Sequence, residues 1–122
     1  MDKTILQDAG IDADAGIRRF MNDREFYEEV LVQFLDDTSM SNAEAAYSAE
    51  DHRALFDAVH GLKGVSGNLD MTDLYKCACE LTELLRHDEG THEQIETSFA
   101  RMQKAYNKAV EGIKKAQTEH EQ

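Results

Sequence analysis

The apolar residues of this chain recur three or four positions apart along most of its length, and no proline interrupts them. This spacing places apolar side chains on one face of an amphipathic α-helix. No segment alternates apolar and polar residues with the period of two that a half-buried strand needs. The seven glycines are also few for a turn-rich sheet protein. The pattern therefore predicts an all-α fold.

Capping and stop signals divide this pattern into segments. The predicted caps are Asp12 and three capping boxes, at Asn22–Glu25, Ser41–Glu44 and Thr91–Gln94. The predicted segments are a partly helical N-terminal stretch at 1–11, a short helix at Ala13–Met21, a helix through Phe26–Leu35, a helix around His60 that ends near Asn68, helices at Met71–His87 and His92–Gln117, and a frayed tail at 118–122.

Three points along the chain stay open at this level. Residues 36–49 fit either one bent helix, continuous with the segment before it, or a second helix. Ser48 or Asp51 can cap the helix around His60, and Asp70 or Thr72 can cap the next one.

Four substantial amphipathic helices joined by short links must bury their apolar faces against one another. We therefore expect one domain over 1–122, an antiparallel four-helix bundle with an extra short N-terminal helix.

Charge and composition exclude several classes of function. The formal net charge is -12, with 25 acidic and 13 basic residues, so no basic surface is available for nucleic acid or anionic membranes. The start of the chain lacks the apolar run of a signal peptide, and no stretch of about 18 apolar residues could span a membrane. Cys77 and Cys79 point about 200° apart on a helix, so they neither pair nor form a zinc pattern. We expect a monomer in the reducing environment of the cytoplasm.

The stretch from Ala58 to Leu69 separates its residues by chemistry when it is drawn as a helix that turns about 100° per residue. One side carries the apolar residues Leu55, Ala58, Leu62 and Leu69. His60 points about 180° away from the middle of that apolar side. The residues around it are Lys63, Gly64 and Gly67, with Arg53 and Phe56 in the turns before.

Glycine inside a helix costs about 1 kcal/mol relative to alanine, and burial cannot require Gly64 or Gly67 on the histidine side. The small residues could permit close packing of a neighbouring helix, but their side of the helix argues against it. A cleared surface around an imidazole, with Lys63 beside it, suits a histidine that another protein must approach closely. An ordinary surface histidine would need none of these features.

The run His60-x-Leu62-Lys63-Gly64-x-Ser66-Gly67-Asn68-Leu69 resembles the signature of histidine-containing phosphotransfer (HPt) domains, with eight typical residues in ten positions. The likeness extends over roughly residues 8 to 116. Two positions depart from the family pattern. Asp70 stands where glycine is usual, which suggests a different turn into the next helix. Thr82 stands where Glu or Gln often hydrogen-bonds the active imidazole.

The resemblance implies a phosphorelay intermediate rather than an enzyme. His60 would be the phosphoacceptor, taking a phosphoryl group from the aspartyl phosphate of one receiver domain and passing it to another receiver's aspartate. The implied partners are response-regulator receivers and a hybrid sensor histidine kinase. The chain would need no cofactor or metal of its own, because Mg²⁺ would belong to the receivers. It also has no P-loop or kinase motif for using ATP.

The candidate phosphate- or partner-binding residues are Lys63, Gly64, Gly67, Arg53, Phe56, Thr82 and Arg86. Thr82 and Arg86 belong to a stripe with Tyr75 and Cys79 on the next helix, beside its core face. They could border His60 or be plain flanking residues. The competing functions are a helical adaptor that docks a receiver or kinase without being phosphorylated, and a metal-binding bundle. The latter needs inward Glu and Glu-x-x-His ligands, which the predicted core faces lack.

Overall fold

The computed structural model describes residues 1–88 and 90–121, and all regular structure in that part of the chain is helical. In chain order the elements are α1 (Lys3–Asp8), α2 (Ala13–Arg19), α3 (Arg24–Gln33), the 3₁₀ helix η1 (Phe34–Asp36), α4 (Ser39–Ser48), α5 (His52–Asn68), α6 (Thr72–Arg86) and α7 (His92–Glu121). The all-α prediction is confirmed.

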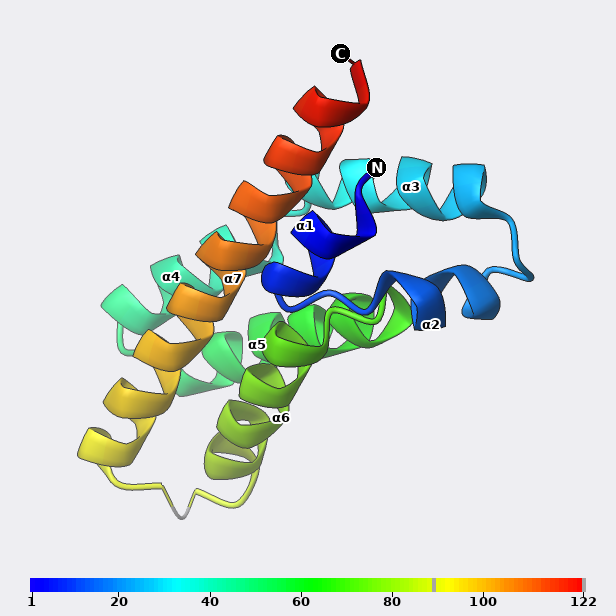
Figure 1. Cartoon of the computed structure of the whole chain (residues 1–122). Helices are drawn as coiled ribbons and strands as arrows, with labels where there is room; N and C mark the ends of the chain where they lie inside the picture. The colour runs from blue at the N-terminus through cyan, green and yellow to red at the C-terminus, as the bar shows by residue number, and fades with distance from the viewer. Residues whose placement is uncertain (89, 122) are drawn as a thin grey trace.

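Helices α4, α5, α6 and α7 form the bundle, with each helix running opposite to the one before (Figure 1). Helix α5 packs between α4 and α6, and α6 packs on α7. The rings of Tyr47 and Phe99 stack with centroids 4.2 Å apart and join α4 to α7. Fully buried side chains from these helices, among them Leu55, Leu62, Leu74, Leu81 and Met102, fill the core.

The N-terminal elements cover one end of the bundle. Helix α1 packs on α7, α3 also contacts α7, and α2 contacts both α1 and α3. Both chain termini lie at this end, and α2 lies beside the end of α5 and the start of α6 (Figure 1). The partly helical segment expected at 1–11 forms α1, while the short helix expected to reach Met21 ends at Arg19.

Residues 36–49 form a separate helix rather than a continuation of α3. The backbone of Asp37 is extended, with ψ 135°, and ends η1. The Asp37 carboxylate then accepts a hydrogen bond of 2.8 Å from the N–H of Ser39. Helix α4 therefore begins at Ser39, and the capping box predicted at Ser41 is wrong.

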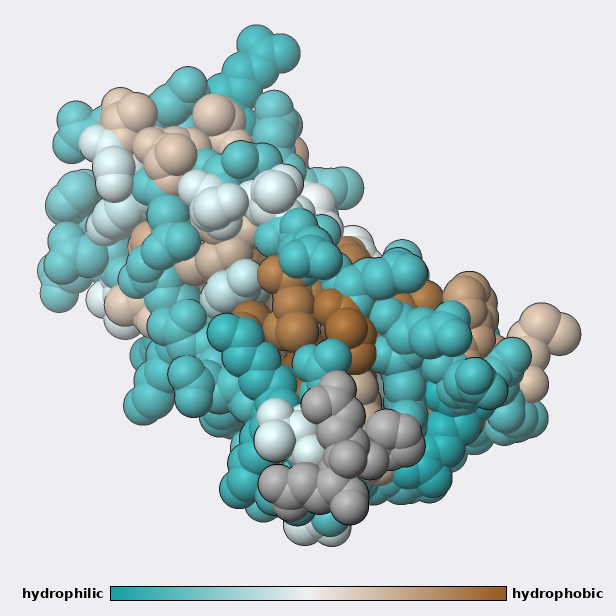
Figure 2. All heavy atoms as spheres, turned by 90° about the horizontal axis from the view of Figure 1, so that it is seen from above, coloured by the Kyte–Doolittle hydropathy of each residue, from teal (hydrophilic) through white to brown (hydrophobic). Residues whose placement is uncertain are grey.

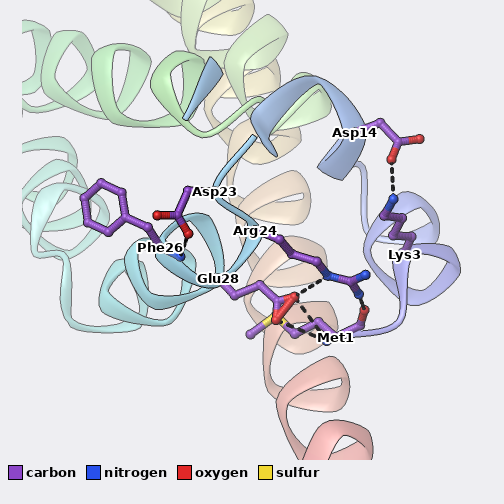
Figure 3. Close-up of polar contacts among 7 residues, drawn as sticks. All are labelled: Met1, Lys3, Asp14, Asp23, Arg24, Phe26 and Glu28. Carbon is purple, nitrogen blue, oxygen red and sulfur yellow. Dashed lines mark hydrogen bonds and ion pairs between the residues drawn. The ribbon is translucent and has the colours of Figure 1, made fainter. Parts of the chain in front are cut away.

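The other caps divide into correct and incorrect predictions. Asp12 caps α2, Asp51 rather than Ser48 caps α5, and the side chains of Thr91 and Gln94 exchange hydrogen bonds with each other's backbone at the start of α7. The predicted Asn22 cap is wrong, because Asn22 has φ 63° and turns the chain just before the helix. Asp23 caps α3 instead and accepts from Phe26 N–H (Figure 3).

Helix α6 starts without a side-chain cap at its N-cap residue, Met71. Neither predicted candidate, Asp70 or Thr72, fills this role. The hydroxyl of Thr72 instead donates to Gly10 O at 3.0 Å and ties α6 to the turn between α1 and α2. At the other end of the chain, α7 extends past the predicted end at Gln117 to Glu121; Gln122 lies outside the described residues.

A charged cluster attaches the start of the chain to α3 (Figure 3). Both carboxylate oxygens of Glu28 lie 3.2 Å from the amino group of Met1. Arg24 donates to the same carboxylate at 3.0 Å and to the Met1 carbonyl at 2.6 Å. Burial raises the pKa of Glu28, but the hydrogen bonds from Arg24 and the amino group outweigh it and hold that pKa below its ordinary value.

The surface seen from above is mostly hydrophilic, with one hydrophobic area near its middle (Figure 2). Half-buried apolar residues of α3, including Val30 and Val32, pack against the core. None of the helices in residues 1–88 and 90–121 combines the length and the apolar character that a membrane span requires.

Candidate functional site

Helix α5 has one buried face and one open face, as its sequence predicts. The side chains of Leu55, Val59, Leu62 and Ser66 are buried. His60 is exposed on the other side. The polar group of Ser66 is satisfied inside the helix, because its hydroxyl donates to Lys63 O at 3.2 Å. Burial of this face therefore fixes the direction in which the imidazole of His60 points.

A groove runs from His60 along α5 to the turn before α6. The residues that line it are Arg19, His60, Lys63, Gly64, Ser66, Gly67, Asn68, Asp70, Thr72 and Tyr75. Three of the predicted candidates, Lys63, Gly64 and Gly67, are thus brought together with His60. The groove is built from three helices, since Arg19 comes from α2 and Tyr75 from α6.

The two glycines of this groove have different surroundings. A Cβ built on Gly64 would have nothing within 4 Å, so the backbone here is open to an approaching molecule. A Cβ on Gly67 would lie 3.0 Å from Cε2 and 3.2 Å from Cδ2 of the Tyr75 ring. Gly67 therefore makes room for an aromatic side chain of the neighbouring helix. The sequence argued against close helix packing as the reason for Gly67, but the structure shows that close packing explains this glycine.

The groove carries positive charge at two points. Lys63 is half-buried and has no carboxylate partner within the described part of the chain. Arg19 binds Asp70 through two hydrogen bonds, Nε to Oδ2 at 2.9 Å and a second nitrogen to Oδ1 at 3.3 Å. The hydrogen bond to Asp70 raises the pKa of Arg19. Lys63 is therefore the more available cation for an incoming anion.

Asp70 also shapes the turn between α5 and α6. Its φ is 54°, in the left-handed region that favours glycine. The aspartate thus adopts a backbone conformation that glycine would adopt readily, and a different turn is not required. Its carbonyl accepts from Asp12 N–H at 2.8 Å, so Asp70 holds the start of α2 by its backbone and the end of α2 by its side chain.

The ring of His60 lies next to that of Phe56, one turn earlier on α5. The ring centroids are 5.8 Å apart, with an interplanar angle of 40°. The guanidinium carbon of Arg86, on α6, lies 5.9 Å from the centroid of the Phe56 ring. Phe56 is half-buried. Phe56, Arg86 and Arg53 do not line the groove. Phe56 contacts His60, Arg86 contacts Phe56, and Arg53 is an exposed residue in the first turn of α5.

Thr82 makes no hydrogen bond to the His60 imidazole in the described part of the chain. Its side chain is 0% exposed, and its hydroxyl donates to Ala78 O at 2.6 Å within α6. This internal hydrogen bond satisfies the hydroxyl, so the residue can join the apolar core. Of the two alternatives left open for Thr82, this bonding favours a plain structural residue of α6 over a partner of His60. Tyr75, from the same stripe, is 40% exposed and lies in the groove; a hydrogen bond with Cys79 raises its pKa.

Sequence reasoning missed Arg19, Asn68 and Thr72 as groove residues. Arg19 reaches the groove only through the packing of α2, so no local pattern marks it. Within the described residues, no group of three or more His, Cys, Asp and Glu side chains could hold a metal ion. The groove can therefore offer an exposed imidazole, one available ammonium group and bare backbone.

Comparison with protein families finds a match between residues 29–113 and the family model described as Hpt domain. The match includes α4, α5 and α6 in full, together with His60 and the glycines that follow it. It leaves out α1 and α2, although α2 contributes Arg19 to the groove. The comparisons with curated proteins and with solved structures return no match.

Proposed function

Because the chain belongs to the Hpt domain family, we propose that His60 is the residue on which it carries a phosphoryl group. Membership of this family gives the chain a role in histidine phosphotransfer within a phosphorelay, as a phosphoryl carrier. The observation that carries the assignment to His60 is its exposed position on α5, beside backbone that is open at Gly64.

The other histidines fit this role less well. His87 and His92 lie 3.4 Å and 3.6 Å from the carboxylates of Glu83 and Glu96. His52 is the first residue of α5 and lies outside the groove. Among the histidines whose side chains the structure describes, His60 alone lines a groove with a lysine and open backbone.

In the proposed step, the unprotonated nitrogen of the neutral imidazole attacks the phosphorus of a receiver's aspartyl phosphate. A P–N bond forms, the P–O bond to the aspartate breaks, and its electron pair leaves on the receiver's carboxylate. The reverse sequence passes the phosphoryl group to a second receiver. Lys63 offsets the charge of the phosphoryl oxygens, and the Gly64 backbone lets the partner come close. Arg53 helps to orient the anionic site of the partner. Mg²⁺ is bound by the receiver.

Hpt domains generally interact with receiver domains. For this chain we propose the receiver of a hybrid sensor histidine kinase as donor and that of a response regulator as acceptor, with the chain acting as a monomer. The overall net charge of -12 would repel an acidic receiver surface, whereas the groove presents Lys63, for which the described part of the chain provides no carboxylate partner. This local charge favours docking at the groove over docking elsewhere.

The test is incubation of the purified chain with a phosphorylated receiver, followed by detection of acid-labile, alkali-stable phosphate. We expect labelling of the natural chain and its loss in His60→Gln. His52→Gln, which removes another exposed histidine of α5, should label normally. Equal labelling of His60→Gln would overturn the assignment. Tight receiver binding without any phosphohistidine would instead indicate the adaptor function.

A further inference from the structure

The imidazole of His60 lacks a polar partner that could hold its orientation. No hydrogen bond or ion pair joins it to any other residue in the described part of the chain. Thr82, the residue on α6 that could have provided one, is buried and bonded to Ala78 O. The ring of Phe56 contacts this side chain, at 5.8 Å between centroids and 40° between planes.

Phe56 is itself held from a second helix. The Arg86 guanidinium lies over its ring at 5.9 Å, close enough for a cation–π interaction. Arg86 is in turn paired with Glu83 at 3.4 Å, one turn earlier on α6. Phe56 is half-buried, so its ring has less freedom than that of an exposed aromatic residue. Contacts thus run from Glu83 through Arg86 and Phe56 to His60.

We infer that Phe56 is a positioning residue for phosphoryl transfer: its ring, held by Arg86, restricts the orientations of the His60 imidazole. This inference rests on the proposed function of His60. In-line transfer requires the attacking nitrogen to face the phosphorus opposite the leaving oxygen. An imidazole that rotates freely about both side-chain bonds satisfies this condition only part of the time. An aromatic neighbour that limits this rotation raises the fraction of productive encounters.

A positioning role differs from a docking role in what it changes. If Phe56 only contacts the partner, its loss should raise the receiver concentration needed for half-maximal transfer. If it orients the imidazole, its loss should lower the maximal transfer rate constant at saturating receiver. A small phosphoryl donor separates the two further, because phosphoramidate approaches an exposed imidazole from any direction and needs no docked geometry.

The experiment compares the natural chain with Phe56→Leu and Phe56→Tyr, using rapid-quench transfer from a phosphorylated receiver and labelling by phosphoramidate. For Phe56→Leu we expect the maximal rate constant to fall about 3- to 10-fold, the range that corresponds to an aromatic pair contact. Its half-saturating receiver concentration and its labelling by phosphoramidate should not change. Phe56→Tyr keeps the aromatic face and should transfer at nearly the natural rate.

Three outcomes would overturn the inference: natural transfer by Phe56→Leu, a change in half-saturation alone, or a Tyr variant as slow as the Leu variant. Nuclear magnetic resonance of the unphosphorylated chain makes the test independent of the proposed function. The chemical shifts of the His60 ring protons should change in Phe56→Leu, because the ring current of Phe56 is lost, and should be close to their natural values in Phe56→Tyr. If no receiver labels the natural chain, the proposed function fails, and unmoved ring protons would separately reject the contact.

Discussion

At the scale of single residues, Gly64 is unusual because its helix would be more stable without it. A Cβ at this position meets nothing within 4 Å, and the residue lies in the interior of α5. Gly64→Ala should therefore raise the free energy of unfolding by up to about 1 kcal/mol. It should also slow transfer from a receiver by about tenfold or more, because a methyl group would stand where the partner approaches. Urea denaturation and rapid-quench transfer measure the two effects.

Gly61→Ala is the matched control for this prediction. Gly61 is also exposed in α5, and its added Cβ would lie 3.6 Å from Ser39 Oγ, an ordinary contact. It does not line the groove. The substitution should stabilise the helix similarly and leave transfer unchanged. If both alanine variants transfer at the natural rate, Gly64 is not needed for access.

Sequence spacing predicted the exposure of a residue well when the residue lies in the middle of a helix face. It did not predict burial for a residue at the edge of a face. The exposure of His60 follows from its angle to the apolar residues of α5, which sequence spacing reports directly. Thr82 lies close to the boundary of the core face of α6, so a small rotation of that helix decides whether it is buried. Periodicity does not determine such a rotation. Arg19 enters the groove through packing between distant segments, which has no local signal.

At the scale of helices, the attachment of α1 depends on a close approach to α7. A Cβ built on Gly112 would lie 2.2 Å from the Ala9 Cβ, a distance at which one helix must move. Gly112→Ala should therefore destabilise the protein by about 1–3 kcal/mol, although alanine favours the helix itself. Thermal or urea unfolding followed by circular dichroism measures this change.

A double variant identifies the cause of this effect. Ala9→Gly removes the atom that the new methyl group would meet, so adding it to Gly112→Ala should recover much of the lost stability. The two changes should therefore couple strongly in a double-mutant cycle. Independent, additive effects would mean that α1 and α7 do not meet at these residues.

Helix boundaries were predictable where one cap residue dominates. Asp12 accepts from a backbone N–H at the start of α2, as its position suggested. For α5 the sequence left Ser48 and Asp51 open, and Asp51 is the cap. The prediction of Asn22 as the cap of α3 was wrong because the next residue, Asp23, can also cap a helix. The local sequence does not distinguish between two adjacent candidates. The break before α4 depends on extended backbone at Asp37, which separates α3 and η1 from the helix that follows.

At the scale of the whole molecule, the charged cluster of Met1, Arg24 and Glu28 ties the start of the chain to α3. The lowered pKa of Glu28 means that the folded state favours its ionised form. This contribution is present above the unfolded pKa of about 4.3 and is lost as pH falls through the lower folded value. Glu28→Gln should therefore cost about 1 kcal/mol at pH 7 and progressively less from about pH 5 to pH 3.

Urea denaturation across this pH range tests the expectation, with Glu29→Gln as the control. Glu29 is an exposed neighbour for which the structure gives no ion pair in its described part. Its replacement should shift stability little at any pH in this range. A constant difference between the natural chain and Glu28→Gln, from neutral to acid, would exclude a role for the ionised carboxylate.

The four-helix core was predictable from sequence because periodicity, short links and the lack of proline all favour the same architecture. The arrangement of α1, α2 and α3 over one end of it was not. Contacts such as that between Asp12 N–H and Asp70 O join distant segments, and they depend on the completed bundle. The position of α2 beside the groove therefore had to come from the structure.

The bare backbone at Gly64 has a practical consequence for anyone who engineers this protein. A library of variants selected for thermal stability should enrich larger side chains at this position. By the prediction above, those variants should transfer the phosphoryl group more slowly. A library selected for phosphorelay signalling in a cell should lose those same variants. Stabilising substitutions should therefore be made elsewhere in the protein, and Gly64 should be kept.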